Sequence, residues 1–321
     1  MSGRPGLRDL VRLARAEIRH GRFQRSMALV AAFSAIVSGF EAYVQHDRGA
    51  FEDRWMWTPV ALVPPVVGAA AASVASERAA RTVLPAVAAA SLVDGVLGFG
   101  LHLRGIARMP GGFRLGQYNV VMGPPVFAPL LMSSVGVLGL LASALRPEAA
   151  PGVAARLASL PIDVDELAAR ADAAGWARAV SAPLATAIAG GRFQRTMALT
   201  AAGFAVLAGG EAYAEHLRGS FQTRLMWTPV WLTPAMAAAG IAAALDAAAA
   251  ETVLPAVSAV TFADGLLGFG LHLRGIARMP GGFSNLRFNL TLGPPLFAPL
   301  LFTSVGMLGL LATVLRRREG R

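Results

Sequence analysis

The sequence predicts an all-α integral membrane protein with eight transmembrane helices, arranged as two tandem parallel four-helix repeats that each contain two related helical hairpins. Apolar residues make up 55% of the chain and charged residues 15%, and the mean hydropathy is +0.54. Apolar stretches of about 20 residues, long enough to cross a hydrocarbon core of about 30 Å, recur along the chain. The predicted spans are 26–46, 56–75, 83–103, 122–143, 196–216, 226–245, 253–273 and 292–314.

The second part of the chain repeats the first. Residues 21–146 align without a gap onto residues 191–316, and 76 of the 126 positions are identical. Because each repeat has an even number of predicted crossings, both copies point the same way and are related by an axis along the membrane normal. The predicted organisation is a cytoplasmic basic amphipathic segment (1–25), a first repeat (26–147), a cytoplasmic linker (148–190), a second repeat (191–316) and a basic tail (317–321).

Arginine placement predicts the orientation. All 29 basic residues are Arg, and 19 of them lie in the N-terminal segment, the turn at 78–81, the linker region 146–195 and the C-terminal tail. We expect the protein to lie in a bacterial inner membrane. The positive-inside rule then places both termini in the cytoplasm. The N-terminal segment lacks the apolar core of a signal peptide. Two interpretations of this segment are open: an amphipathic helix on the inner leaflet, or a solvated basic tail.

Several chemistries are excluded by what the sequence lacks. There is no Cys, so disulfides, thiolate metal sites and iron–sulfur ligation are excluded. The sequence also lacks a phosphate-binding loop, a nucleophile elbow and a zinc-protease motif. The high pI of about 11.4 reflects the Arg-rich flanks of membrane helices and does not indicate nucleic acid. We therefore expect a redox or binding subunit more than a self-sufficient enzyme.

A shorter pattern occurs twice in each repeat. The pattern G-x-x-(A/G)-(Y/F)-x-x-H-x-R-G is found at 39–49, 95–105, 209–219 and 265–275. Positions i, i+3, i+4 and i+7 share one helix face, so each His lies on a stripe of small and aromatic residues. Four of the five His residues of the chain belong to this pattern.

A flat apolar groove with an imidazole on either side predicts a bis-His haem b site in each repeat. The predicted iron ligands are His46 with His102 and His216 with His272. Gly39, Gly95 and Gly98 would make room for the macrocycle, and Tyr43 and Phe99 would pack on it. The propionates would pair with Arg48, Arg104, Arg218 and Arg274. Such a subunit would pass electrons between a donor on the outer face and quinone.

Two other interpretations remain open at this stage. Acids at membrane depth indicate a proton or ion path, and together with prolines in the even-numbered spans they favour a transporter or channel. These acids are Glu41, Asp94, Glu211 and Asp264. Alternatively, small residues pack helices and interfacial His, Tyr and Arg anchor helix ends, which predicts a cofactor-free membrane anchor for a partner complex. Outer-loop Arg54, Arg108 and Arg114, beside Trp55, Trp57 and Tyr118, would dock an acidic partner or lipid headgroups.

Overall fold

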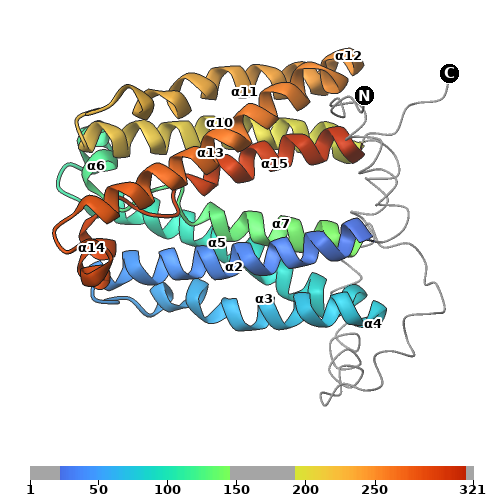
Figure 1. Cartoon of the computed structure of the whole chain (residues 1–321), viewed down its shortest axis with the longest axis horizontal. Coiled ribbons are helices and arrows are strands. Elements are labelled where there is room, and N and C mark those ends of the chain that lie inside the picture. Colours follow the sequence, from blue (N-terminus) through green and yellow to red (C-terminus); the bar gives the residue numbers. More distant parts are fainter. Residues whose placement is uncertain (1–21, 145–191, 316–321) are drawn as a thin grey trace, which may run out of the picture.

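The computed structural model describes residues 22–144 and 192–315, and every regular element in these two ranges is a helix (Figure 1). The predicted all-α class is therefore confirmed for this part of the chain. The predicted amphipathic segment before residue 22, the linker at 148–190 and the basic tail lie outside the described residues.

The helices run between two ends of the bundle. At one end, here called the terminal end, α2 and α10 begin and α7 and α15 finish (Figure 1). The opposite end, called the loop end, holds α6 and α14. In the first repeat the elements are α2 (Arg22–Arg48), η1 (Arg54–Trp57), α3 (Thr58–Ala75), α4 (Glu77–Arg81), α5 (Val83–Arg108), η2 (Gly112–Leu115), α6 (Gly116–Met122) and α7 (Leu130–Ala144).

The same series of elements recurs 170 residues later. It comprises α10 (Arg192–Arg218), η4 (Arg224–Trp227), α11 (Thr228–Leu245), α12 (Ala247–Glu251), α13 (Val253–Arg278), η5 (Gly282–Asn285), α14 (Leu286–Leu292) and α15 (Leu300–Leu315). Every element of the second repeat begins 170 residues after its counterpart in the first.

In the part of the chain that the structure describes, six helical segments are long and apolar enough to cross a membrane, so the chain is an integral membrane protein with several spans. They are Gln24–Arg48, Arg54–Ala75, Glu77–Arg108, Gln194–Arg218, Arg224–Leu245 and Ala247–Arg278. The predictions of continuous spans at 122–143 and 292–314 are wrong. In their place stand two shorter apolar helices, Leu130–Ala144 and Leu300–Val314, each preceded by a non-helical segment.

The non-helical segments follow from their prolines. Residues 123–129, here called the first break, read GPPVFAP, and residues 293–299, the second break, read GPPLFAP. Proline lacks an amide donor and disfavours the helical conformation in the residue before it. The helix therefore ends at Met122 and begins again only at Leu130. A hydropathy window registers the apolar side chains but not this loss of backbone hydrogen bonds.

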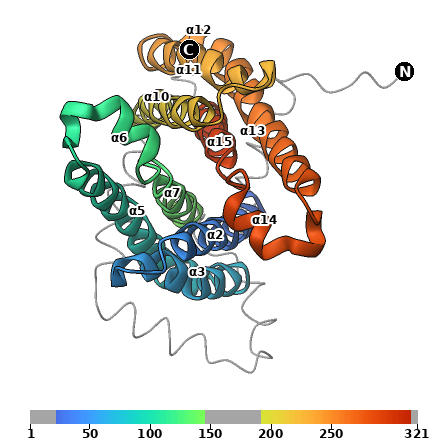
Figure 2. The ribbon, with the colours of Figure 1, turned by 90° about the vertical axis from the view of Figure 1, so that its left-hand side faces the viewer.

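The two repeats pack into one bundle with a shared core. Within the first repeat, α2 packs on α3 and α7, and α5 packs on α7; across the repeats, α7 contacts α15, α6 contacts α10 and α14 contacts α2 (Figure 2). The core is built largely of Ala, Leu and Met from both repeats, among them Ala31, Leu141, Ala201 and Leu308. Small side chains allow the close helix approach on which membrane packing depends.

Candidate functional site: the histidine pairs and the helix breaks

The four motif histidines form two pairs at the loop end. The ring centres of His46 and His102 lie 6.4 Å apart with their planes at 70°. The rings of His216 and His272 lie 6.5 Å apart at 66°. Each pair joins the first and third long helices of one repeat, which is the pairing that the sequence pattern predicts.

Each imidazole is held by a backbone carbonyl of a later segment, which is η1 or η4 for the first histidine of each pair and a helix break for the second. The Nδ1 atom of His46 lies 2.7 Å from the Met56 carbonyl oxygen, and Nδ1 of His102 lies 2.5 Å from that of Pro125. In the second repeat both separations are 2.6 Å, to Met226 and Pro295. Because a carbonyl oxygen can only accept, Nδ1 is the protonated nitrogen and a neutral ring keeps a free lone pair on Nε2. Ligating histidines commonly have this arrangement.

An aromatic cluster adjoins His46. The Phe51 ring meets the His46 ring edge to face at 6.0 Å and stacks on Trp57 at 3.9 Å. Tyr43 lies 5.5 Å from Phe51. Phe51 has a φ of +51°, in the left-handed region that bulky residues rarely occupy. The sequence interpretation included Tyr43 but missed Phe51, although this Phe is identical in both repeats and the second repeat places Phe221 in the same way.

The glycine stripes do not form the predicted open slot. A Cβ at Gly39 would overlap the Val63 side chain of α3, and one at Gly95 would lie 2.5 Å from the Ser133 amide nitrogen of α7. Gly98 meets Pro129 of the first break. These glycines therefore pack directly on neighbouring helices and on the first break, and their predicted role in admitting a macrocycle stays a prediction. Phe99 is likewise engaged, because its ring stacks on Phe127 at 5.6 Å.

The buried glutamate of each repeat hydrogen-bonds to the helix break of the other repeat. Glu41, 6% exposed, accepts a hydrogen bond from the Phe297 amide at 3.0 Å. Glu211, 9% exposed, accepts one from the Phe127 amide, also at 3.0 Å. Gln45 donates to the second oxygen of Glu41 at 2.7 Å. These carboxylates thus satisfy amides that the helix breaks leave without an intrahelical partner.

The aspartates have a different environment. Asp94 hydrogen-bonds with the Thr58 side chain and lies near His46, and Asp264 has the same relation to Thr228 and His216. The four acids that the sequence suggested as one ion path therefore divide into two kinds. The glutamates hold the breaks, and the aspartates lie beside the histidine pairs.

Two of the motif arginines also reach the opposite repeat. Arg48 donates to the Gly293 carbonyl at 3.0 Å, and Arg218 donates to the Val121 carbonyl and to the Gly123 carbonyl at 3.2 Å. These bonds correct the predicted pairing of Arg48 and Arg218 with propionates, because both side chains bind backbone carbonyls of the breaks or beside them. Their counterparts in the third helices, Arg104 and Arg274, are exposed, and their predicted role stays a prediction.

Asn119 is a structural residue that the sequence interpretation missed. Its buried side chain donates to the Pro110 carbonyl at 3.0 Å and to the Gly112 carbonyl at 2.7 Å. It thereby closes the turn in which Gly111 and Gly112 have positive φ. Asn289 does the same in the second repeat. The sequence contains a signal for this role. Asn119 is the one residue of 114–122 that is identical to its counterpart in 284–292.

Within residues 22–144 and 192–315, no three His, Asp or Glu side chains gather as a metal-binding group. Each histidine pair therefore offers two nitrogen donors. No protein family model, curated protein or solved structure matches the chain. The functional conclusion accordingly rests on the geometry of this site.

Proposed function

We propose that this chain is a membrane subunit that holds one b haem in each repeat, between His46 and His102 and between His216 and His272. Through these haems it passes electrons between a donor at the loop end and quinone. The observation that carries the proposal is the repeated pair of adjacent imidazoles, each with its Nδ1 bound to a carbonyl, which leaves Nε2 as the nitrogen that can coordinate a metal.

The spacing of the rings suits a shared iron. Two imidazole nitrogens on one metal, each ~2 Å from it, put the ring centres about 6 Å apart. The two pairs have separations of 6.4 and 6.5 Å. Two protein donors suffice in a haem because the porphyrin supplies the other four nitrogens. The ligand set thus fits, while the glycines that were expected to admit the macrocycle are packed against α3 and α7.

The residues of the site have separable tasks in this proposal. The carbonyls of Met56 and Pro125 fix the tautomer and direction of the two imidazoles, and Asp94 adds a negative charge close to His46. The Phe51–Trp57 stack covers one side of His46. When bound, the haem supplies one-electron chemistry.

The absorption spectrum of the purified protein tests the proposal. Protein produced with ample haem should show a Soret band, and the double variant His46→Ala with His102→Ala should keep about half of it, because the second pair is intact. The variant His20→Ala, which alters the one histidine outside the motif, is the matched control and should keep all of it. Wild-type protein without Soret absorbance would refute the haem assignment.

A second candidate function is transport, and the helix breaks favour it. Non-helical backbone at membrane depth, held by charged side chains, is typical of binding sites in transporters made of repeats. Here the breaks are held by Glu41 and Glu211 from the opposite repeat. Colourless protein that carries a solute across vesicle membranes would favour this function, and colourless protein that copurifies with a catalytic partner would favour a membrane anchor.

A further inference from the structure

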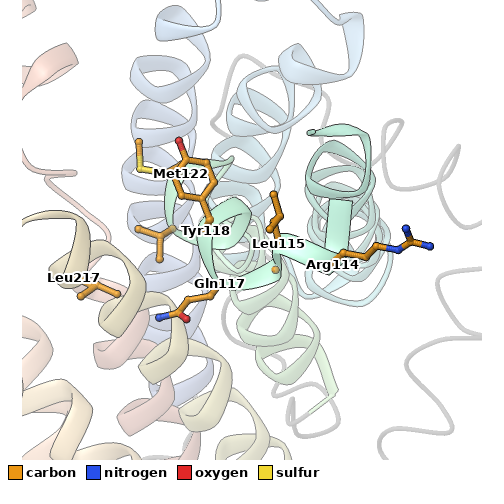
Figure 3. A pocket seen from close by; sticks show the side chains of 8 residues that line it. Arg114, Leu115, Gln117, Tyr118, Met122 and Leu217 are labelled. Atoms are coloured by element: carbon orange, nitrogen blue, oxygen red, sulfur yellow. The ribbon is translucent and has the colours of Figure 1, made fainter. Parts of the chain in front are cut away.

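A pocket of about 480 Å³ lies at the loop end between α6 of the first repeat and α10 of the second (Figure 3). Its size is within the range of small-molecule sites. Val121 and Met122 of α6 and Leu217 of α10 contribute apolar surface to it. Gln117, Tyr118 and Arg114 contribute the polar side chains, and no acidic residue is among the lining residues.

The pocket marks a place where the two repeats differ. At the corresponding contact of α14 with α2, Arg287 replaces Gln117 and Asp47 replaces Leu217. There the Arg287 guanidinium and the Asp47 carboxylate form an ion pair at 3.6 Å. One contact between the repeats is thus bridged by opposite charges, whereas the other has an amide and an apolar side chain facing a pocket.

We propose that this pocket binds one anionic phospholipid from the leaflet at the loop end. An acyl chain would lie on Val121, Met122 and Leu217, and the phosphate would lie at the rim near Arg114. Figure 3 shows Leu217 and Arg114 at opposite sides of the pocket, with the guanidinium extending outward. The apolar wall and the positive charge are therefore separated as they are in a lipid with its tail inside and its headgroup out.

Exposure and charge support a lipid occupant. Tyr118 is 62% exposed and Met122 is 52% exposed, so both lack protein cover for their apolar surface. Tyr is favoured at the membrane interface, where the ring is covered by lipid and the hydroxyl bonds to headgroups. Arg114 is the charged residue of the lining, and a lipid phosphate provides the oxygen acceptors that a guanidinium binds. The proposal does not rest on haem binding.

Exchanging the residues of the two contacts tests the proposal. The full-length protein would be purified in detergent, and native mass spectrometry would count the phosphatidylglycerol and phosphatidylcholine molecules that it retains. We expect one retained phosphatidylglycerol per chain. Gln117→Arg with Leu217→Asp introduces the ion pair and should weaken retention about tenfold or more, which corresponds to about 1.4 kcal/mol. In the second repeat Ser284 stands where the first has Arg114, so Arg287→Gln and Asp47→Leu are combined with Ser284→Arg. This triple variant removes the ion pair, supplies the missing cation and should add a second lipid.

A single substitution tests the charge. Arg114→Gln should reduce the preference for phosphatidylglycerol over phosphatidylcholine, and Arg278→Gln, at an exposed arginine of the second repeat outside the lining, should leave it unchanged. Equal retention of both lipids by the wild type would overturn the anionic occupant. Unchanged lipid counts in both the double and the triple variant would overturn the site itself. Retention of a quinone in place of phosphatidylglycerol would also overturn it. The gain expected from the triple variant keeps the test decisive if the double variant misfolds.

Discussion

Replacing Glu41 with Leu should destabilise the protein by about 1–3 kcal/mol, which is the cost of leaving a buried hydrogen-bonding group without its partner. The group concerned is the Phe297 amide, which donates to Glu41 at 3.0 Å. Bilayer hydrocarbon contains no water that could replace the lost acceptor, so the cost should lie in the upper part of this range. Glu41→Gln keeps an acceptor oxygen and should lose less.

The second repeat gives an internal replicate. Glu211→Leu removes the acceptor of the Phe127 amide and should have a similar effect. The two glutamates bind different breaks and share no hydrogen-bond partner in the described chain, so the effects of Glu41→Leu and Glu211→Leu should add. The double variant should then lose about 2–6 kcal/mol.

Unfolding of the purified protein in mixed micelles with increasing SDS would measure these changes. Glu52→Leu is the matched control, because it makes the same substitution at an exposed position in a loop at the loop end. It should leave the unfolding midpoint within experimental error of the wild type. If Glu41→Leu unfolded at the same SDS fraction as Glu52→Leu, the carboxylate would not be the acceptor that stabilises the second break.

Three further changes test other contacts. Gly95→Ala places a Cβ 2.5 Å from the Ser133 amide and should cost about 1–3 kcal/mol, whereas Gly100→Ala in the same helix meets no atom within 4 Å and should be neutral in the same unfolding assay. Asn119→Ala removes both bonds to the Pro110–Gly112 turn and should increase proteolysis at this turn, while leaving α2 to α5 resistant. Ala50→Cys, the only thiol in an otherwise Cys-free chain, should react with impermeant reagents from the periplasmic side; labelling from the cytoplasmic side alone would reverse the predicted orientation.

The helices were predictable to different degrees. Spans such as 26–46 and 83–103 were found because hydropathy and length are sufficient for a continuous apolar helix. Hydropathy and length were not sufficient at 122–143 and 292–314, because the Pro-rich segments there keep apolar side chains but lack the backbone hydrogen bonds of a helix. Prolines 124, 125 and 129 are visible in the sequence, but where the helix begins again depends on packing against α5.

The histidine pairs were predictable and the glutamate bonds were not. His46 and His102 occur at one register in helices that run the same way, so their proximity follows from the pattern. Glu41 had two equivalent candidates, the Phe127 and Phe297 amides, because the segments around them are nearly identical in sequence. Sequence alone gives no reason to choose the break that is 256 positions away over the one in the same repeat. The choice depends on how the repeats pack together.

Residues of both repeats hydrogen-bond to the first break. This arrangement links the two histidine pairs to the packing between repeats. His102 binds the Pro125 carbonyl and Glu211 binds the Phe127 amide, two residues further along. Loss of Glu211 should therefore loosen the carbonyl that orients His102, while loss of Glu41 should act on His272 through the second break. In protein that lacks His216 and His272, only the first proposed haem site remains. In this background, Glu211→Leu should lower haem retention and Glu41→Leu should not. Equal losses from both substitutions would mean that the glutamates act on overall stability and not on the orientation of one histidine.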